Sequence, residues 1–396
     1  ALARADDDTV MMGGGNPALI PAMEAVWRRR LEDILASPGE LERMLGLYDT
    51  PRGAERFCDA LAGMFRSQYG WEVAGSNVAV CPGSQTAYFL LINMLAGPAE
   101  GRLRKIVFPI VPEYIGYADQ GVSAGLFRAV RPRIDRLAAN RFKYHIDFDA
   151  LRLGDDVAAV CLSRPTNPSG NLVDDAEIAR LSELARDAGV PLMIDNAYGV
   201  PFPRITFRPA SPYWDRHVIA TFSLSKLGLP STRTGIVVAD EEIIERLGAM
   251  NAVVGLAPGG IGQAIVQPLL VGGRLLELCD EHVTPFYRQR SADALGWLDE
   301  ALAGGPDYAV HVSEGALFLW LWLPGLGVSS RELYARCKRR GLLVVPGEYF
   351  FPGLDDADHW PHRRECLRLS YAQPPETVRR GMRILGEVVR EAAAGR

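Results

Sequence analysis

The hydrophobic positions between residues 54 and 240 follow two spacings, one typical of helices and the other of buried strands. In the segment 56–69 the apolar side chains recur at helical spacing, as Phe57, Leu61 and Phe65 illustrate. Other segments are short, continuous apolar runs, such as VAAVCLS at 157–163, which is typical of a strand buried on both faces. We expect helices at 56–69, 84–95 and 174–188, and strands at 78–81, 106–108, 157–163, 192–195, 218–222 and 235–239.

Short buried strands separated by helices predict a mostly parallel sheet between helical layers, that is, a three-layer αβα sandwich of the α/β class. Beyond residue 242 the pattern changes to a long helical stretch at 273–302, with a break at Pro285 left open. Strands are then expected at 318–323, 342–345 and 366–371, and helices at 330–340 and 375–394. We predict a large domain at 50–285, a small α+β domain at 286–396, and an N-terminal segment at 1–49 that packs with the small domain.

The composition excludes several classes of protein. The 396 residues carry a formal net charge of −5, with 48% hydrophobic and 23% charged residues, close to the average of globular proteins. This balance excludes a disordered chain and argues against a nucleic-acid binder, which needs a basic surface. The most apolar stretch, LFLWLWL at 317–323, ends at Pro324 and is far shorter than the ~20 residues of a membrane-spanning helix.

The N-terminal residues and the cysteines indicate a cytoplasmic protein. The chain opens ALARADDD, so Asp6–Asp8 occupy positions where a signal peptide needs an apolar run. It does not begin with Met, and we expect processing or trimming there. Six scattered cysteines form no CxxC pair, and three of them lie in apolar strand-like runs, which favours reduced, buried thiols. They are Cys58, Cys81, Cys161, Cys279, Cys337 and Cys366.

Chemistry in doubly wound folds gathers at the carboxyl ends of the strands, and the strand at 78–81 ends in such a segment. Gly83 follows the strand, and Ser84 and Gln85 open the next helix. Free backbone N–H groups and the helix dipole favour a phosphate at such a place. The segment is not a nucleotide P-loop, because no Gly-Lys-Ser/Thr follows. An ordinary N-cap by Ser84 is the alternative.

Two further strand ends carry charged side chains. Asp195 ends an apolar strand, and a carboxylate buried there costs several kcal/mol unless a cation, such as a ligand nitrogen, accompanies it. The alternative is a helix cap. Lys226 follows the strand at 218–222, and a buried lysine amine loses its proton readily and attacks aldehydes. Arg233 supplies a fixed charge for a phosphate. An anion site, a carboxylate and a lysine at one sheet edge are what pyridoxal phosphate requires.

These motifs resemble, in this order, the fold-type-I aminotransferases, which depend on pyridoxal 5′-phosphate, and the resemblance covers almost the whole chain. The segment RPTNPSG at 164–170 is similar to the NPTG segment of that family, with Ser169 in place of the usual Thr. Asp195-x-x-Tyr198 and Ser223-x-Ser225-Lys226 continue the pattern. Six further segments look more specifically like the valine–pyruvate aminotransferases of that family. They are GGGNP at 13–17, PEYIGY at 112–117, IDNAYGVPFP at 194–203, KLGLP at 226–230, LAPGGIG at 256–262 and FFPGL at 350–354.

The resemblance implies a role for each matching residue. Lys226 would bind the cofactor as a Schiff base and then carry a proton between substrate and cofactor, while Asp195 would keep the pyridine nitrogen protonated. Tyr198 and Asn167 would hydrogen-bond the ring oxygen, and Tyr114 would stack on the ring. The remaining cofactor contacts would come from Gly83, Ser84, Gln85, Ser223 and Arg233.

The resemblance also implies a substrate site and a partner. Arg368 would pair with the substrate α-carboxylate, and Gly14 and Gly15 would let the backbone approach the substrate, the alternative being a flexible tail. Tyr48 would reach the phosphate of the neighbouring subunit, which predicts a homodimer with shared active sites. We therefore expect a ping-pong aminotransferase that connects valine or alanine with pyruvate or 2-oxoisovalerate, in an apolar pocket with no second arginine.

Two other functions stay open at this point. The same residues suit an enzyme of specialised metabolism with the same fold and cofactor, which eliminates or replaces a β- or γ-substituent or forms a C–C bond. Residues 231–232 and 259–263 are where such a divergence would lie. A non-catalytic regulator on this fold is the second alternative, but it would need a basic DNA-binding segment, and the chain has no room or charge for one.

Three clusters favour plainer interpretations. His359 and His362 lie near Asp355, Asp356 and Asp358, but a proline between the two histidines prevents the regular helix that presents such pairs, and we expect no metal. Trp320 and Trp322 alternate with leucines, which predicts core packing or a subunit contact. The basic cluster is interrupted by Asp135 and is expected to form a solvated face. It consists of Arg128, Arg131, Arg133 and Arg136.

Overall fold

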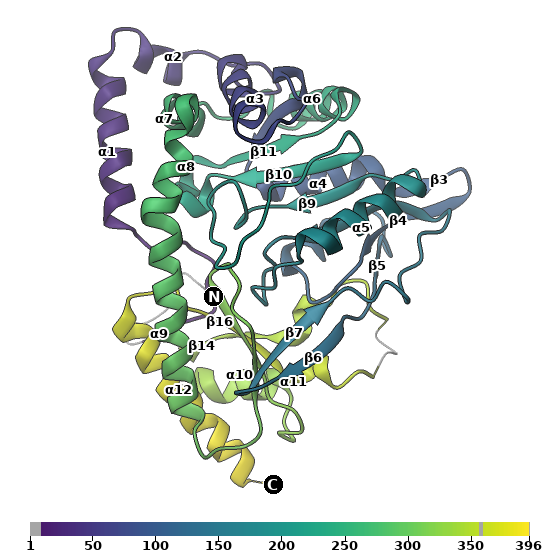
Figure 1. The fold of residues 1–396 in the computed structure, drawn as a ribbon, viewed down its shortest axis with the longest axis vertical. Helices are drawn as coiled ribbons and strands as arrows, with labels where there is room; N and C mark the ends of the chain where they lie inside the picture. The colour runs from purple at the N-terminus through teal and green to yellow at the C-terminus, as the bar shows by residue number, and fades with distance from the viewer. Residues whose placement is uncertain (1–8, 356–358, 396) are drawn as a thin grey trace.

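A mixed eight-stranded sheet is the largest of the three sheets in the structure, a computed structural model that describes residues 9–355 and 359–395 (Figure 1). Its order is β3-β4-β8-β9-β10-β11-β2, with β5 beside β4. The strands from β5 through β4, β8 and β9 to β10 are parallel, whereas β11 pairs antiparallel with β10 and β2, and β3 with β4. The strands are β2 (Val78–Pro82), β3 (Gly97–Ala99), β4 (Arg102–Phe108), β5 (Phe127–Ala129), β8 (Val157–Ser163), β9 (Leu192–Asp195), β10 (Val218–Ser223) and β11 (Thr234–Val238).

Helices cover both faces of this sheet, with α5 on the near side and α4 on the far side in Figure 1. The amphipathic stripe predicted at 56–69 forms α3, and the predicted helix at 84–95 has the expected ends. Helix α5 begins after Asp174, whose side chain accepts a hydrogen bond from Glu177 N–H in a capping box. The predicted α/β sandwich is therefore confirmed. The helices are α3 (Glu55–Tyr69), α4 (Ser84–Leu95), α5 (Asp175–Asp187), α6 (Glu241–Gly255) and α7 (Ile261–Leu270).

A second sheet has the order β15-β16-β13-β12-β7-β6 and carries the smaller α+β unit. Two of its strands come from the middle of the chain, since the hairpin of β6 and β7 pairs through β7 with β12. The division of the chain into residue ranges stays a prediction. The elements are β6 (Arg133–Leu137), β7 (Arg141–His145), β12 (Ala309–His311), β13 (Phe318–Trp322), β15 (Val345–Pro346), β16 (Cys366–Ser370), α10 (Ser330–Arg339), α11 (His362–Glu365) and α12 (Pro375–Ala394).

The N-terminal segment runs along both units. Strand β1 (Val10–Met11) pairs in parallel with β14 (Leu342–Leu343), next to α12. Helices α1 (Pro21–Ala36) and α2 (Glu40–Gly46) then pass to α7 on the large unit, as the purple ribbon in Figure 1 shows. The residues between β1 and α1 therefore cross the boundary between the two sheets, and the glycine run at 13–15 lies at that crossing.

The structure answers the question left open at Pro285 and differs from the prediction at 342–345. The helical path does not break at Pro285, because Pro285 stands in the first turn of α9 (Thr284–Leu302), after a π-helical turn at Cys279–Val283 and α8 (Arg274–Leu278). The strand predicted at 342–345 is two strands, since β14 and β15 join different sheets on either side of Val344. Pairing partners decide where β14 ends and where β15 begins, and local hydrophobicity does not reveal these partners.

The cores of both units are built from the predicted apolar runs. Every residue of β8 is buried, and Trp320 on β13 is fully buried, as the core interpretation predicted. All six cysteines are buried and unpaired, as expected for reduced thiols. Among the described residues no helix is long and apolar enough to span a membrane.

The packing of α12 against α9 gives a stability prediction. A Cβ on Gly386 of α12 would lie 2.4 Å from the backbone oxygen of Ala301 on α9, whereas a Cβ on Gly296, also on α9, would meet nothing within 4 Å. We expect Gly386→Ala to lower stability by about 1–3 kcal/mol through overpacking. Gly296→Ala should raise it by up to ~1 kcal/mol through helix propensity. Thermal unfolding measures both, and equal shifts would contradict the close approach.

Candidate active site

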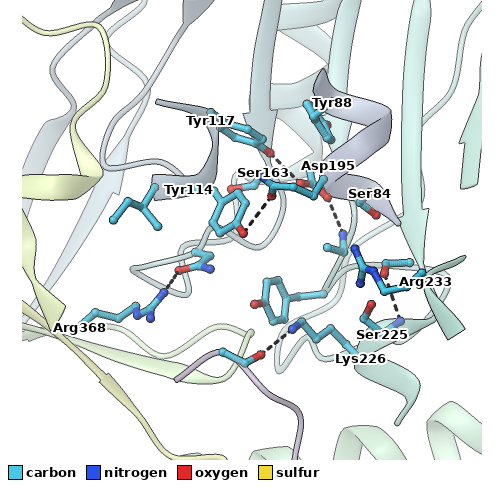
Figure 2. A pocket seen from close by; sticks show the side chains of 17 residues that line it. Ser84, Tyr88, Tyr114, Tyr117, Ser163, Asp195, Ser225, Lys226, Arg233 and Arg368 are labelled. Carbon is cyan, nitrogen blue, oxygen red and sulfur yellow. Dashed lines mark hydrogen bonds between the residues drawn. The ribbon is translucent and has the colours of Figure 1, made fainter. Parts of the chain in front are cut away.

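A cavity of about 310 Å³ opens at the carboxyl ends of β8, β9 and β10 (Figure 2). It lies where parallel strands end, as expected for a doubly wound sheet. It also takes residues from the second sheet and from the N-terminal crossing. Its lining consists of Gly15, Ser84, Gln85, Tyr88, Tyr114, Ile115, Tyr117, Ser163, Asn167, Asp195, Ala197, Tyr198, Ser223, Ser225, Lys226, Arg233 and Arg368.

Asp195 ends β9 with its side chain inside this cavity. One carboxylate oxygen accepts a hydrogen bond from Tyr117 Oη (2.7 Å) and the other from Ala197 N–H (2.9 Å). Burial raises the pKa of Asp195, and these hydrogen bonds and the charge of Lys226 act in the opposite direction. No Lys, Arg or His of the described chain lies within 4.0 Å of the carboxylate, so a cationic group of a ligand would find an unpaired negative charge there.

Lys226 lies in the 3₁₀ turn η4 (Ser225–Leu227), directly after β10. Its Nζ donates a hydrogen bond to the carbonyl oxygen of Gly15 (2.6 Å) and lies 5.4 Å from the centre of the Tyr198 ring. Burial, followed by the charges of Arg368 and Arg233, lowers the pKa of Lys226 to about 8. Near neutral pH a much larger fraction of this amine is therefore neutral and nucleophilic than of an ordinary lysine, and above about pH 8 most of it is.

An anion cradle lies at the N-terminus of α4. Gly83 has a φ of 88°, and a Cβ there would lie 2.1 Å from a guanidinium nitrogen of Arg233, so only glycine fits. Arg233 itself takes the left-handed conformation (φ 48°), a strain typical of functional sites. No carboxylate of the described residues lies within 4.0 Å of its guanidinium. Ser84, Ser223 and the start of a twelve-residue helix complete a site suited to a phosphate.

Arg368 reaches the opposite end of the cavity from β16 (Figure 2). It donates to Asn167 Oδ1 and to the carbonyl oxygen of Gly13, both at 2.8 Å, while its buried Nε has no partner. The guanidinium lies 4.2 Å from the ring centre of Phe318 and 5.1 Å from that of Phe350. Burial lowers the pKa of Arg368 to about 10. A buried guanidinium with a free N–H suits a carboxylate ligand.

The aromatic and amide side chains predicted for the site enclose the space between these charges. Tyr114 Oη donates to Gln85 Oε1 (3.2 Å), and the Tyr114 ring stands edge-on to Tyr117. Tyr198 is buried next to Phe318. Asn167 lies in the loop after β8, with its amide oxygen turned to Arg368.

Most predicted site residues meet in this cavity, and three do not line it. Gly83 and Gly14 are next to lining residues in the chain, and Tyr48 is 83% exposed on the surface. The sequence analysis missed Tyr117, whose Oη donates a hydrogen bond directly to Asp195. Tyr117 lies three residues after Tyr114, in the turn η3 (Ile115–Tyr117), and this spacing could have identified it as a site residue.

The other candidate clusters have structural roles. His362 is buried beside Tyr144 and Trp360, and the described residues contain no group of three or more His, Cys, Asp or Glu side chains placed to hold a metal. Asp356 and Asp358 lie outside the described residues. Arg136 stacks on Trp322, while Arg128 pairs with Asp156.

Comparisons with known proteins agree with this geometry. Residues 24–385 match the family "Aminotransferase class I and II". The chain is 45% identical over 386 residues to the valine–pyruvate aminotransferase of Escherichia coli K12, covering 97% of this chain and 92% of that protein. The crystal structure of valine–pyruvate aminotransferase from Salmonella typhimurium LT2 superposes with a TM-score of 0.91 at 42% identity, covering 99% of both chains. A structure from Psychrobacter arcticum 273-4 gives 0.97 at 41% identity, covering 100% of this chain and 94% of that one. The chain thus belongs to the class I and II aminotransferases and is a transaminase of fold type I.

Proposed function

We propose that this transaminase uses pyridoxal 5′-phosphate to move an amino group between a small aliphatic amino acid, valine or alanine, and a 2-oxo acid, pyruvate or 2-oxoisovalerate. The observation that carries the proposal is one cavity in which Asp195, Lys226, Arg233 and Arg368 are arranged around a common space. The names of the E. coli and Salmonella relatives favour the same pair of substrates.

The residues of the cavity fit this cofactor. The unpaired Asp195 carboxylate suits a protonated pyridine nitrogen, the Lys226 amine suits an aldehyde, and the cradle beside Gly83 suits a phosphate. Ser84, Gln85, Ser223 and Arg233 line that end of the cavity. When bound, pyridoxal phosphate supplies an aldehyde carbon and a ring that accepts electrons.

The side chains then have distinct tasks. Asp195 holds a proton at the ring nitrogen, because both of its oxygens are oriented by Tyr117 and Ala197 and no cation of the chain competes. Lys226 would hold the aldehyde and, when displaced by a substrate amine, its freed amine would take the proton from the substrate Cα and deliver it to the former aldehyde carbon, on the other side of the nitrogen. Tyr198 and Asn167 would donate hydrogen bonds to the ring oxygen, and Tyr114 would stack on the ring face, since all three line the cavity.

The charges of the lining also select the substrate. Lys226, Arg233 and Arg368 are the cations among the lining residues. If the first two hold the cofactor, Arg368 alone remains for a carboxylate, which favours monocarboxylic amino acids over aspartate or glutamate. Ile115 adds an apolar wall suited to an aliphatic side chain.

Activity measurements test the proposal. Incubation of the holoenzyme with valine and pyruvate should yield 2-oxoisovalerate and alanine. Lys226→Ala should lower the rate by about 10²- to 10⁴-fold, the range for loss of a general acid–base group. The control Lys338→Ala, on the exposed face of α10, should leave it unchanged. Release of ammonia from an amino acid with a β-leaving group, without amino exchange with valine, would contradict the proposal and support the elimination alternative.

The lowered pKa of Lys226 predicts a pH dependence. The amine is protonated below its pKa, so in the cofactor-free protein its reaction with pyridoxal should accelerate as the pH rises and level off above about 8. Replacing Arg233 by Gln removes one of the charges that lower the pKa and should move the midpoint upward. Stopped-flow absorbance measures the rate, and a rate that keeps rising toward pH 10 in the unaltered protein would contradict it.

We further propose a homodimer with shared active sites, because one face carries many exposed apolar side chains around Tyr48. The residues 44–51 adjoin α6 and α7 there, since Asn251 donates to Pro51 O and a Cβ on Gly260 would approach Met44 O. A second copy is the occupant that would let the exposed Tyr48 reach a phosphate. The exposed side chains are Leu45, Leu47, Tyr48, Val253, Val254, Leu256 and Ile261.

Mixing two defective variants tests the shared site. Lys226→Ala lacks the amine, and Tyr48→Ala lacks the partner's phosphate contact. If the phosphate site takes Tyr48 from the partner, hybrid dimers rebuild one intact site, and about a quarter of all sites in an equal mixture should regain cofactor affinity and activity. Sedimentation of each variant measures whether it is a dimer. A mixture no more active than the average of its parts would contradict the shared site.

A cytoplasmic location is the last part of the proposal. It is supported by the six cysteines, which are all buried and unpaired, as expected in a reducing compartment.

A further inference from the structure

The side chain of Glu113 is fully buried beside the cavity, yet it has no part in the chemistry above. It stands just before Tyr114, in the segment that follows β4. No Lys, Arg or His of the described residues lies within 4.0 Å of its carboxyl group. A buried carboxyl without a cation is unfavourable unless hydrogen bonds offset the desolvation, so its contacts show what it does.

Three hydrogen bonds converge on this carboxyl group. Ser163 donates to it twice, from N–H (2.8 Å) and from Oγ (2.6 Å), and Tyr114 N–H donates to it at 3.1 Å. Strand β8 runs on to Ser163 beyond the last residues that pair with β4. Glu113 therefore supplies the acceptor that a neighbouring strand would otherwise supply, and it ties the start of the Tyr114 segment to the end of β8.

The residues that Glu113 connects form two walls of the active site. Tyr114 and Ser163 both line the cavity, and Ser163 is the register partner of Asp195 on β9. The backbone N–H of Glu113 donates to Phe350 O (2.8 Å), and the Phe350 ring lies against Arg368. Burial raises the pKa of Glu113 to about 8, and the nearby Asp195 acts in the same direction. An apolar residue of similar volume would fill the space, but it would leave two buried backbone N–H groups without acceptors.

We propose that Glu113 is a positioning residue that, by accepting hydrogen bonds from Ser163 and from Tyr114 N–H, holds the Tyr114 ring against the cavity and so sets the affinity for an aromatic ring bound there. The proposal rests on the proposed function, because pyridoxal phosphate is the ligand that brings this ring. Glu113 itself touches neither cofactor nor substrate and acts through Tyr114.

The affinity of the cofactor-free protein for pyridoxal phosphate is the main test, with fluorescence quenching as the readout. In Glu113→Gln the amide oxygen keeps one acceptor for Ser163 N–H, while its NH₂ group faces Tyr114 N–H and cannot accept from it. We expect binding to weaken about 3- to 10-fold, the range of one aromatic stacking interaction. Glu113→Asp, which keeps the carboxyl group but is shorter, should weaken binding similarly. The KM for valine should stay within twofold, because Arg368 keeps all its contacts.

The matched control is Glu365→Gln. Like Glu113, Glu365 accepts hydrogen bonds from a side-chain and a backbone donor, here Trp322 Nε1–H and Gly325 N–H, but it lies outside the cavity. It should leave the affinity for pyridoxal phosphate unchanged. Thermal unfolding of each variant shows that it is folded, and Glu113→Asp replaces Glu113→Gln if the latter is not.

A double-mutant cycle distinguishes positioning from a general structural effect. In a Tyr114→Ala background there is no ring to hold, so Glu113→Gln should change the affinity by less than about twofold. The proposal is overturned if Glu113→Gln weakens binding equally in both backgrounds, or if neither Glu113 variant weakens it in the unaltered protein. Failure of the unaltered protein to bind pyridoxal phosphate would instead overturn the proposed function.

Discussion

The Asp195 carboxylate is removed from water at the end of β9, where Tyr117 Oη and Ala197 N–H donate hydrogen bonds to its two oxygens. The surrounding architecture supplies the hydrogen-bond donors that this buried carboxylate requires. A carboxylate can lie at this depth because parallel strands end together and because η3 presents Tyr117 over their ends. The unpaired charge that remains is unfavourable for the empty fold and favourable for a cationic ring nitrogen. The buried carboxylate is thus already desolvated and oriented before a ligand binds, and this preorganisation favours a ligand with a cationic nitrogen.

The two arginines of the cavity act at a distance on the nucleophile between them. Arg233 and Arg368 have no carboxylate within 4.0 Å in the described part of the chain, and their charges are directed at the cavity. Both lower the pKa of Lys226. In the proposed function, the charges that would attract a phosphate and a carboxylate therefore also keep the lysine amine ready to react. With both anions bound, the effect of the arginines on the pKa of Lys226 would be largely cancelled, and the amine would become more basic when it must take up a proton.

The parts of the fold that depend on local pattern were predictable. The strands β8 and β9 and the helix α4 have the predicted ends, because burial on both faces and turn residues at each end mark them in the sequence. Once the strands are predicted, the carboxyl ends of the first sheet are known, and Asp195 and Lys226 are expected there because each comes at or just after a strand end. The hairpin β6–β7 was not predictable, because it pairs with β12, more than 160 residues later. Tyr117 was missed for a similar reason, since its partner is 78 residues away and only the turn η3 brings them together.

The substrate end of the site exists only when the two sheets and the N-terminal crossing are assembled. Arg368 comes from β16 of the second sheet, and its two partners, Asn167 and Gly13, come from the loop after β8 and from the crossing. That loop is held from the other side by Lys143 on β7, whose Nζ donates to Asn171 Oδ1 (2.8 Å) and pairs with the buried Glu314 (2.5 Å). A buried ion pair adds little net stability, but breaking it leaves an uncompensated charge, so it restricts the arrangements open to the loop. The position of Asn167 is thereby fixed from the second sheet, and the arginine that would bind the substrate carboxylate is oriented by the same contacts that join the two halves of the molecule.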